Sequence, residues 1–296
     1  MKISRKHKEW LWAYAFIAPT VLGIFIFTIG PIFYAFYISL TRWNNITPPQ
    51  FIGAANYTRM LTDSIFHSEI INTFIFVIVS VPLTISISIL IAVMLTAKIP
   101  AVGFFRTVIF IPYVTLPAAA AMVWENIFNS RFGMINGFLR SLGLPLVDWF
   151  GSSRSVMGII IAMTVWASIG YFSVILMVGI KSLPVSFLEA AKIDGATSVQ
   201  SFFRITVPLL TPQIFFVTTI CMIGAFSMFD AIFIFGRGSV IIRDGIRTMA
   251  FGIFDRGFTF QEMGYAAANA VVLLVFIMAV TVLQFVSQKY WVHYGE

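Results

Sequence analysis

The sequence has little charge, one cysteine and three histidines, and each shortage excludes a class of protein. Only 10% of the 296 residues are charged and 59% are hydrophobic, whereas about a quarter of an average soluble domain is charged. The single cysteine, Cys221, excludes an intrachain disulfide. The histidines His7, His67 and His293 are scattered, without the spacing of a zinc site. His67 and Glu69 could pair as ligands, but a solvated loop is the preferred interpretation. We therefore predict no metal site in this chain.

The sequence motifs of several enzyme classes are also missing. There is no Gly-x-x-x-x-Gly-Lys-[Ser/Thr] loop, so the chain has no recognisable nucleotide site of its own. Neither the His-Glu-x-x-His nor the Gly-x-Ser-x-Gly pattern of proteases and lipases occurs. We predict a chain that is not an enzyme, has no catalytic residues and holds no cofactor. Its net charge of +7 is spread through loops, which argues against nucleic-acid binding.

Long apolar runs are abundant, and they predict an all-α membrane protein. A crossing needs about 20 apolar residues, so a polytopic bundle of about six transmembrane helices fits this length. The bundle is predicted over residues 10–289, with residues 1–9 and 290–296 as cytoplasmic ends. The predicted spans cover about residues 10–40, 70–97, 106–126, 155–180, 205–235 and 264–289. The basic N-terminal segment and the closing residues Lys98 and Lys289 favour this orientation, and the first run is too long for a signal-peptide core.

Prolines interrupt several of the predicted spans. Pro19 and Pro31 are expected to kink the first span or to mark its ends. Pro112 and Pro117 in the third span predict a discontinuous helix, and the fifth is interrupted early by Pro208 and Pro212. Broken backbone is tolerated in a membrane only against protein or a water-filled cavity. The third span is therefore predicted to line a solute path. The polar stretches 129–155 and 236–262 are predicted to be external loops.

Residues 184–208 form the most polar interval inside the apolar part of the chain. Ser186 and Glu189 have the spacing of a capping box, which predicts a helix beginning at Ser186. Gly195 is well placed to end that helix, because glycine adopts the left-handed cap conformation without penalty. Thr197 and Gln200 give a second start signal. This segment is predicted to be two short helices with a glycine elbow between two spans.

The same segment carries a family resemblance. Glu189-Ala190-Ala191, three residues, Gly195, nine residues, then Ile205-Thr206-Val207-Pro208 resembles the EAA loop of ABC import permeases. Asp194-Gly195-Ala196 resembles the carbohydrate-uptake branch, the MalF- or UgpA-like subunits of binding-protein-dependent sugar transport. Two places depart from the family pattern. Val207 stands where leucine is usual, and residues 235–239 read Phe-Gly-Arg-Gly-Ser where Thr-x-Gly-Gly-Pro is frequent, so no role is carried over to that stretch.

The resemblance implies a permease in the inner membrane of a bacterial or archaeal cell. It implies a heterodimer with a second permease, two cytoplasmic ATPases that hold ATP and magnesium, and an extracytoplasmic solute-binding protein. The coupling residues carried over to this chain are Glu189, Ala190, Ala191, Asp194 and Gly195. The solute is expected to be a sugar or a sugar-like molecule, with glycerol phosphates, sialic acids and oligosaccharides all open.

Polar and aromatic side chains inside the spans are the candidates for contact with the solute. They are Asn126, Trp166, Tyr171, Asp230 and Asn269. Amides and acids hydrogen-bond sugar hydroxyls, and aromatic rings pack against sugar faces. Asp230 is equally compatible with a residue at the membrane interface. It also leaves open an ion-gradient-driven secondary transporter, although such a carrier has no reason to hold the 184–208 elbow. A non-transporting membrane scaffold is the third class, against which the broken spans argue.

Overall fold

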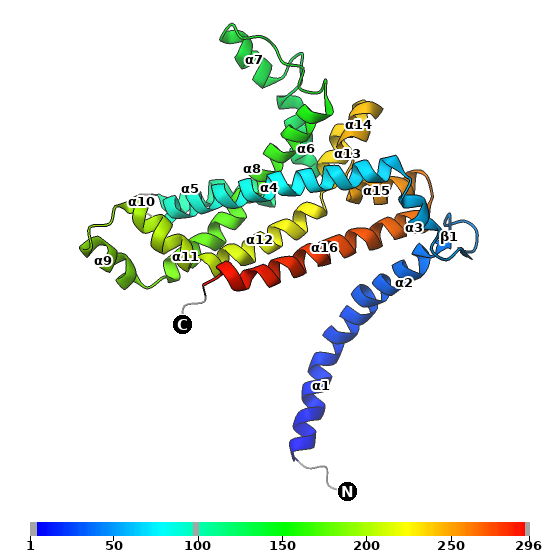
Figure 1. The fold of residues 1–296 in the computed structure, drawn as a ribbon, viewed down its shortest axis with the longest axis horizontal. Helices are drawn as coiled ribbons and strands as arrows, with labels where there is room; N and C mark the ends of the chain where they lie inside the picture. Colours follow the sequence, from blue (N-terminus) through cyan, green and yellow to red (C-terminus); the bar gives the residue numbers. More distant parts are fainter. Residues whose placement is uncertain (1–4, 97–100, 294–296) are drawn as a thin grey trace. The chain divides into compact units, whose positions relative to one another are not determined.

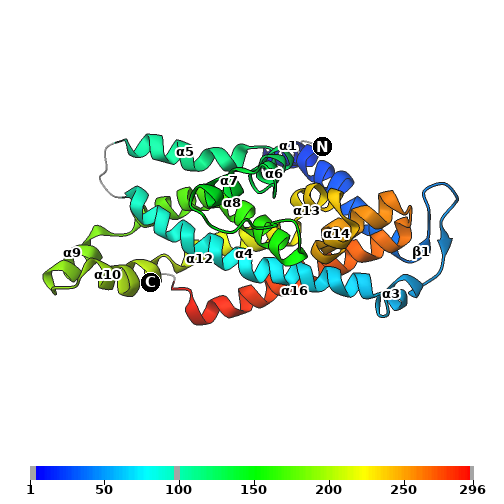
Figure 2. The same ribbon diagram turned by 90° about the horizontal axis from the view of Figure 1, so that it is seen from above.

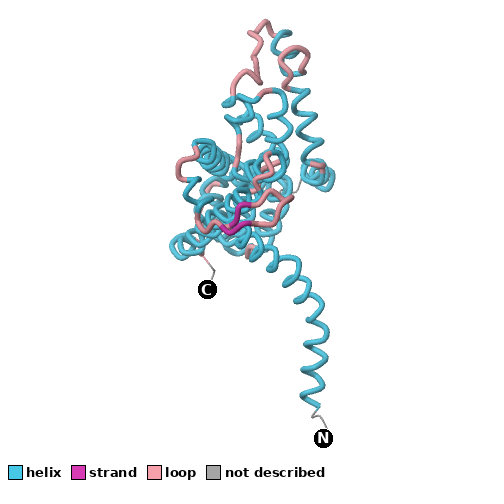
Figure 3. Tube along the Cα trace, turned by 90° about the vertical axis from the view of Figure 1, so that its right-hand side faces the viewer, coloured by secondary structure: helices cyan, strands magenta, loops and turns pink. Residues whose placement is uncertain are grey.

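The structure is a computed structural model that describes residues 5–96 and 101–293. Helix dominates, and the only strands in this described part form one short antiparallel hairpin, β1 (Thr41–Arg42) and β2 (Gln50–Phe51) (Figure 3). Thr41 lies opposite Phe51 in the hairpin. The chain divides into two compact units, Met1–Asp63 with Ile253–Val272 and Ser64–Gly252 with Leu273–Glu296.

The first unit contains the first predicted span. It is built from α1 (Arg5–Ile24), the π-helix η1 (Phe25–Ile29) and α2 (Gly30–Ser39). Pro19 lies inside α1, whereas Pro31 lies at the start of α2, directly after the π-helical turn. Proline has no N–H, and its ring collides with the carbonyl one turn earlier. The π-helical turn is wider than an α-helical turn, because the Gly30 N–H donates to the carbonyl of Phe25, five residues earlier. This wider turn accommodates Pro31.

A buried asparagine joins the hairpin of the first unit to a helix. The remaining elements of this unit are α3 (Ala55–Met60), the π-helix η4 (Asp255–Thr259) and the first turns of α16 (Met263–Trp291). The side-chain amide of Asn56 donates to the carbonyls of Ser39 at 2.8 Å and Thr41 at 2.9 Å. A Cβ on Gly264 would overlap the same Thr41 carbonyl, so glycine is required for this close approach.

The second unit is a bundle of helices with α8 at its centre. In chain order its elements are α4 (Ser64–Thr96), α5 (Val102–Val114), α6 (Pro117–Ile127), α7 (Met134–Ser141), α8 (Ser153–Ser182), α9 (Val185–Ile193), α10 (Ser198–Ser201), η2 (Phe202–Thr206), α11 (Val207–Leu209), α12 (Thr211–Phe226), α13 (Asp230–Phe235), η3 (Gly236–Gly238), α14 (Val240–Ile246), α15 (Met249–Phe254) and the later turns of α16. Helix α8 packs against α4, α5, α12 and α14 (Figure 1). The fully buried side chains of Phe76, Ile160 and Leu176 belong to the core of this bundle.

The number of spans agrees with the sequence prediction. Among residues 5–96 and 101–293, five stretches are long and apolar enough to cross a membrane: Trp12–Ser39, Ser64–Thr96, Ser153–Ser182, Thr211–Gly238 and Met263–Trp291. The pair α5 and α6 makes a sixth when it is counted as one bent span. The predicted all-α membrane fold of about six spans is confirmed. The predicted end of the second span at Lys98 falls outside the described residues, as do the outermost residues of both chain ends.

The stretch 236–262, which the sequence predicts to be an external loop, is largely folded into short helices. Ile242 and Ile246 of α14 and Met249 of α15 are buried. Ile242 and Ile246 are four residues apart and share one face of α14. That helix ends at Ile246, where Arg247 leaves the helical region at φ −52° and ψ 131°, so Met249 belongs to a separate helix. The charged residues among these apolar ones made the stretch resemble a loop in the sequence.

One glycine fixes how closely α5 approaches α8, and this leads to a first prediction. A Cβ on Gly170 of α8 would overlap the backbone carbonyl of Ile109 in α5. Backbone cannot move aside as a flexible side chain can, so Gly170→Ala is expected to destabilise the chain by roughly 1–3 kcal/mol and to lower its unfolding temperature in detergent. The matched control is Gly158→Ala, elsewhere on α8, where the added methyl meets nothing within 4 Å. Equal unfolding temperatures for the two variants would contradict the close packing of α5 on α8.

Candidate functional site

A cavity of about 240 Å³ in the second unit lies where two spans are interrupted. The chain bends by 98° between α5 and α6. Three residues, 227–229, separate the end of α12 from the start of α13. We call this the helix-break cavity, and it is lined by Pro112, Tyr113, Thr115, Pro117, Ala120, Met163, Thr164, Ala167, Ser168, Gly224, Ser227, Met228, Phe229, Asp230 and Ala231. The predicted break in the third span is confirmed. The break in the fifth span that lines the same cavity was not predicted.

The two breaks have different causes. Pro117 opens α6, and the preceding residue Leu116 is held outside the helical region at φ −59° and ψ 121°, as expected for a residue before proline. The second break contains no proline. There Met228 lies between α12 and α13, outside both helices. Its carbonyl accepts a hydrogen bond of 2.8 Å from the hydroxyl of Thr248. A distant side chain therefore stabilises the second break.

The helix-break cavity combines polar groups with an aromatic wall. The ring of Tyr113 stacks on Tyr171, with centroids 4.3 Å apart and planes 7° from parallel. Asp230 is the first residue of α13 and is exposed. Thr164 and Ser168 bring hydroxyl groups to the α8 side. A solute rich in hydroxyl groups would find hydrogen-bonding partners and an apolar ring face in the same place.

The five predicted solute-contact residues are not all brought together. Asp230 lines the cavity. Tyr171 does not line it but stacks on Tyr113, which does. Trp166 is 39% exposed and contacts Trp124, with ring centroids 5.7 Å apart. Asn126 lies outside the lining, with its amide donating to the carbonyl of Met122 in its own helix. Asn269 is completely buried in the first unit. Tyr113 lines the cavity and was missed, although the proline beside it marked the broken span.

The 184–208 elbow consists of two short helices, as predicted. Helix α9 ends at Ile193, and Gly195 has a φ of +77°. The Ala196 N–H donates to the Ala191 carbonyl at 2.9 Å, and the Gly195 N–H donates to the Lys192 carbonyl at 3.1 Å, which is a Schellman motif. Helix α10 then begins with the predicted capping box of Thr197 and Gln200. Figure 2 shows α9 and α10 at one end of the α4–α8–α12 bundle.

The predicted start of α9 was wrong. The helix begins at Val185 after Pro184, and no side chain caps its N-terminus. Pro184 is the extended residue before the helix, with φ −60° and ψ 123°. Ser186 therefore lies inside the first turn, too late to cap the helix in a box with Glu189. Glu189 and Ala190 are exposed, Ala191 is buried and Ile193 is 86% exposed. The exposed face of α9 thus pairs an acid with apolar side chains.

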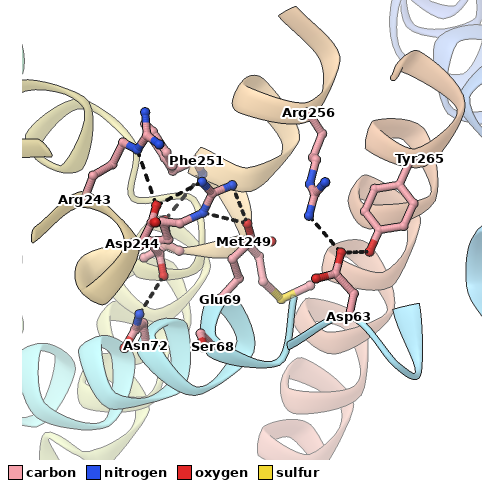
Figure 4. Close-up of polar contacts among 12 residues, drawn as sticks. Asp63, Ser68, Glu69, Asn72, Arg243, Asp244, Met249, Phe251, Arg256 and Tyr265 are labelled. Carbon is pink, nitrogen blue, oxygen red and sulfur yellow. Dashed lines mark hydrogen bonds and ion pairs between the residues drawn. The ribbon is translucent and has the colours of Figure 1, made fainter. Parts of the chain in front are cut away.

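A buried ion pair lies between the beginning of α4 and the segment after α14 (Figure 4). Glu69 is 1% exposed and Arg247 is 2% exposed. Two nitrogens of Arg247, Nε and Nη2, donate to Glu69 Oε1 at 3.1 and 3.0 Å. The backbone is joined as well, because the Asn72 amide donates to the Arg247 carbonyl at 3.0 Å and the Thr73 hydroxyl accepts the Met249 N–H at 2.9 Å. The interpretation of Glu69 as part of a solvated loop beside His67 is therefore wrong.

The first unit contains its own charged cluster, of which Figure 4 labels Asp63, Arg256 and Tyr265. Asp63 Oδ2 accepts from Arg256 at 2.8 Å and from the Tyr265 hydroxyl at 2.7 Å. Arg59 forms a two-pronged hydrogen bond with Glu262 at 3.0 and 3.1 Å. The hydrogen bond that Arg59 donates to Glu262 raises the pKa of the Arg59 guanidinium, so this arginine is charged at any physiological pH. No group of three or more potential metal ligands was found in the part of the chain that the structure describes.

A second prediction concerns the exposed carboxylate in the helix-break cavity. Asp230→Asn keeps a hydrogen-bond acceptor of the same shape in place, so the expected loss is at the low end of what one hydrogen bond contributes, roughly 0.5 kcal/mol. Transport is therefore expected to stay within about threefold of wild type, with an unchanged response to pH. The measurement is the initial uptake rate at several pH values, with and without an ionophore. Loss of accumulation in the variant would instead identify Asp230 as a coupling site for ions.

Comparisons with known proteins agree with the architecture described above. Residues 64–290 match the sequence family described as "Binding-protein-dependent transport system inner membrane component". The chain is 36% identical to the probable ABC transporter permease protein YesP of Bacillus subtilis, over 99% of this chain and 96% of that protein. It is 32% identical to the arabinooligosaccharides transport system permease protein AraP of Halalkalibacterium halodurans, over 92% and 85% of the two chains. A chain in the crystal structure of a bacterial alginate ABC transporter, in complex with an alginate pentasaccharide-bound periplasmic protein, has the same fold, with a TM-score of 0.86, 20% identity and 98% of both chains covered.

Proposed function

Because this chain belongs to the family of binding-protein-dependent transport system inner membrane components, we propose that it forms half of the saccharide path of an ATP-driven importer. The observation that carries the proposal is that two interrupted spans open onto one cavity with polar and aromatic walls. Interrupted spans are characteristic of transport sites, because unpaired backbone groups near the middle of a membrane need a polar cavity. A scaffold has no use for them.

The saccharide class rests on the chemistry of the cavity and on two relatives. Asp230, Thr164 and Ser168 offer hydrogen-bonding groups, and Tyr113 offers an aromatic surface. The AraP relative is named for arabinooligosaccharides, and the structurally similar transporter is described with alginate. We infer that this chain conducts a sugar or sugar-like solute, which an extracytoplasmic binding protein delivers.

The partners we propose are a second permease subunit, two cytoplasmic ATPases that hold ATP and magnesium, and the binding protein. In this arrangement the chain is not itself an enzyme, and both of its termini are cytoplasmic. The first span supports a partner subunit, because none of its most apolar window is buried. Helix α9 supports an ATPase contact, because it exposes Glu189 together with Phe187 and Ile193.

The coupling mechanism we propose follows from how α9 is joined to the bundle. The Schellman turn at Gly195 and the capping box at Thr197 fix the angle between α9 and α10. A displacement of α9 by the ATPases would therefore reach the start of the fifth span instead of being absorbed by the loop. ATP bound elsewhere supplies the free energy, and this chain converts the movement into a change of access to the cavity.

Uptake into proteoliposomes tests the proposal. The chain is reconstituted with its second permease, the ATPases and the binding protein, and uptake of a labelled saccharide is measured. We expect uptake to require ATP and all partners and to survive an ionophore. Uptake that collapses with the ion gradient would overturn the proposal in favour of a secondary transporter, and nucleotide hydrolysis by the purified single chain would contradict its role as a permease only.

A further inference from the structure

A second cavity of about 460 Å³ lies in the same unit, beyond the far end of α6. We call it the Phe132 cavity. It is lined by Glu125, Asn129, Ser130, Arg131, Phe132, Phe150, Phe235, Gly238, Ser239 and Ile242. Three of these residues, Phe235, Gly238 and Ser239, belong to the stretch that departs from the usual family pattern. The proposed function above does not use this cavity.

The two cavities lie along one pair of packed helices, α6 and α13. On α6, Ala120 lines the helix-break cavity and Glu125 lines the Phe132 cavity. On α13, Ala231 lines the helix-break cavity and Phe235 lines the Phe132 cavity. An α-helix rises 1.5 Å per residue, so these linings are offset by roughly 6–8 Å along the helix pair. That offset is comparable to one sugar ring with its glycosidic bond, which is the spacing that two neighbouring rings of one oligosaccharide require.

Contacts within the chain hold the backbone of Phe132 and the ring of Phe150 at the Phe132 cavity. Phe132 is 75% exposed, yet its backbone is fixed, because Asn129 Oδ1 accepts the N–H groups of Arg131 at 3.0 Å and of Phe132 at 3.2 Å. The ring of Phe150 packs edge-on against Phe235, with centroids 5.7 Å apart. A ring that is ordered before it binds loses little conformational freedom when a ligand packs against it.

A row of aromatic rings supports this end of α6. Trp124 stacks on Phe128 at 5.6 Å, and Phe128 meets the edge of Trp149 at 5.2 Å. The indole N–H of Trp149 donates to Oδ1 of the buried Asn136 at 3.0 Å. These contacts hold the end of α6, which carries Glu125, against the loop that precedes α8.

The lining has the composition of a site for a neutral saccharide. Glu125 and Arg131 are both exposed at the cavity. The carboxylate can accept hydrogen bonds from hydroxyl groups and the guanidinium can donate them. One charge of each sign gives no net attraction for an anionic or cationic ligand. Phe132 and Phe150 supply apolar surface for the C–H face of a sugar ring.

Building on the proposed function, we propose that the Phe132 cavity is a second saccharide subsite. It holds one ring of a neutral oligosaccharide whose next ring reaches the helix-break cavity. The divergent stretch that includes Gly238 and Ser239 then contributes to selection of the solute. The subsite favours oligosaccharides over monosaccharides, because a single ring can gain contacts in only one of the two cavities.

Equilibrium binding to the assembled importer in nanodiscs, without the binding protein, tests the subsite. The probes are labelled maltotriose, arabinotriose and glucose. Phe132→Ala and Phe150→Ala are each expected to raise the Kd of the better-bound trisaccharide about three- to tenfold, as loss of one ring contact implies, and to leave glucose binding unchanged. Phe138→Ala is the matched control, since Phe138 is 63% exposed on α7 and does not line the cavity.

The outcomes separate this inference from the proposed function. If a saccharide is imported and the Phe132→Ala and Phe150→Ala variants bind the trisaccharide like wild type, the subsite is overturned and the import function stands. An equal loss of glucose and trisaccharide binding also overturns it, because the cavity would then not be selective for length. If the complete importer moves no saccharide at all, the proposed function fails, and the subsite fails with it.

Discussion

Arg247→Ala is expected to destabilise the chain by about 3–5 kcal/mol, because it removes one partner of a buried ion pair. Glu69 would be left with its carboxylate almost fully buried and without either guanidinium hydrogen bond. The substitution also removes the guanidinium from beside the ring of Phe251, 5.4 Å from its centroid. We expect a large fall in the unfolding temperature, measured by fluorescence-detected size exclusion of the detergent-solubilised protein, and a low yield at 37 °C.

Two comparisons show whether the buried charge is the cause. Arg59→Ala removes an arginine from an exposed pair with Glu262, and such pairs contribute about 1 kcal/mol or less. The double variant Glu69→Leu with Arg247→Met replaces both partners by apolar groups, which is often tolerated. It should be more stable than Arg247→Met alone. If the double variant is less stable than the single one, the burial of the Glu69 carboxylate without the guanidinium of Arg247 is not the cause of the loss.

Gly195→Pro is expected to abolish coupling between ATP hydrolysis and uptake. The residue has a φ of +77°, whereas proline is fixed near −65°, and proline lacks the N–H that bonds to the Lys192 carbonyl. The Schellman turn would therefore open and change the angle between α9 and α10. Gly195→Ala is the graded control. A Cβ there meets nothing within 4 Å, so alanine adds only backbone strain of roughly 1 kcal/mol.

The acid on α9 gives a companion test of the same surface. Glu189 caps no backbone group at the start of its helix, so Glu189→Lys should leave the fold intact and weaken association of the ATPase by reversing the charge on α9. Glu189→Gln removes the charge and keeps the shape of the side chain. Its ATPase association is expected to lie between that of the wild type and that of Glu189→Lys. The measurements are co-purification of the ATPase and its stimulated activity in proteoliposomes. Full retention of both in Glu189→Lys and Gly195→Pro would remove the coupling role from this loop.

Local signals in the sequence were sufficient where the cause of a feature is local. Proline at 117 predicted the break between α5 and α6, because the residue before a proline is kept out of the helix. Gly195 and the pair Thr197 and Gln200 predicted the elbow, since each acts on neighbouring backbone groups. The start of α9 failed on the same local scale. The helix begins at Val185, directly after the extended Pro184, so the capping box predicted at Ser186 does not form.

Features that depend on distant residues were not predicted. Nothing beside Glu69 in the sequence reveals its partner, which lies 178 residues further along the chain. The break before Asp230 has no proline and depends on the hydroxyl of Thr248, 20 residues away from Met228. Two of the four predicted solute contacts in the second unit, Asn126 and Trp166, lie neither in the lining of the helix-break cavity nor on a ring stacked on it, because polarity within a span does not reveal which way a side chain points. Asn126, for example, satisfies its amide within its own helix.

The separation between Glu69 and Arg247 along the chain also has a consequence for biosynthesis. At about 5–20 residues per second, the 178 residues between them take the ribosome roughly 9–36 seconds to add. During that interval α4 has been made, but the arginine that pairs with its acid has not. The nascent acid must stay hydrated until the later segment arrives, so the beginning of α4 completes its assembly only near the end of translation.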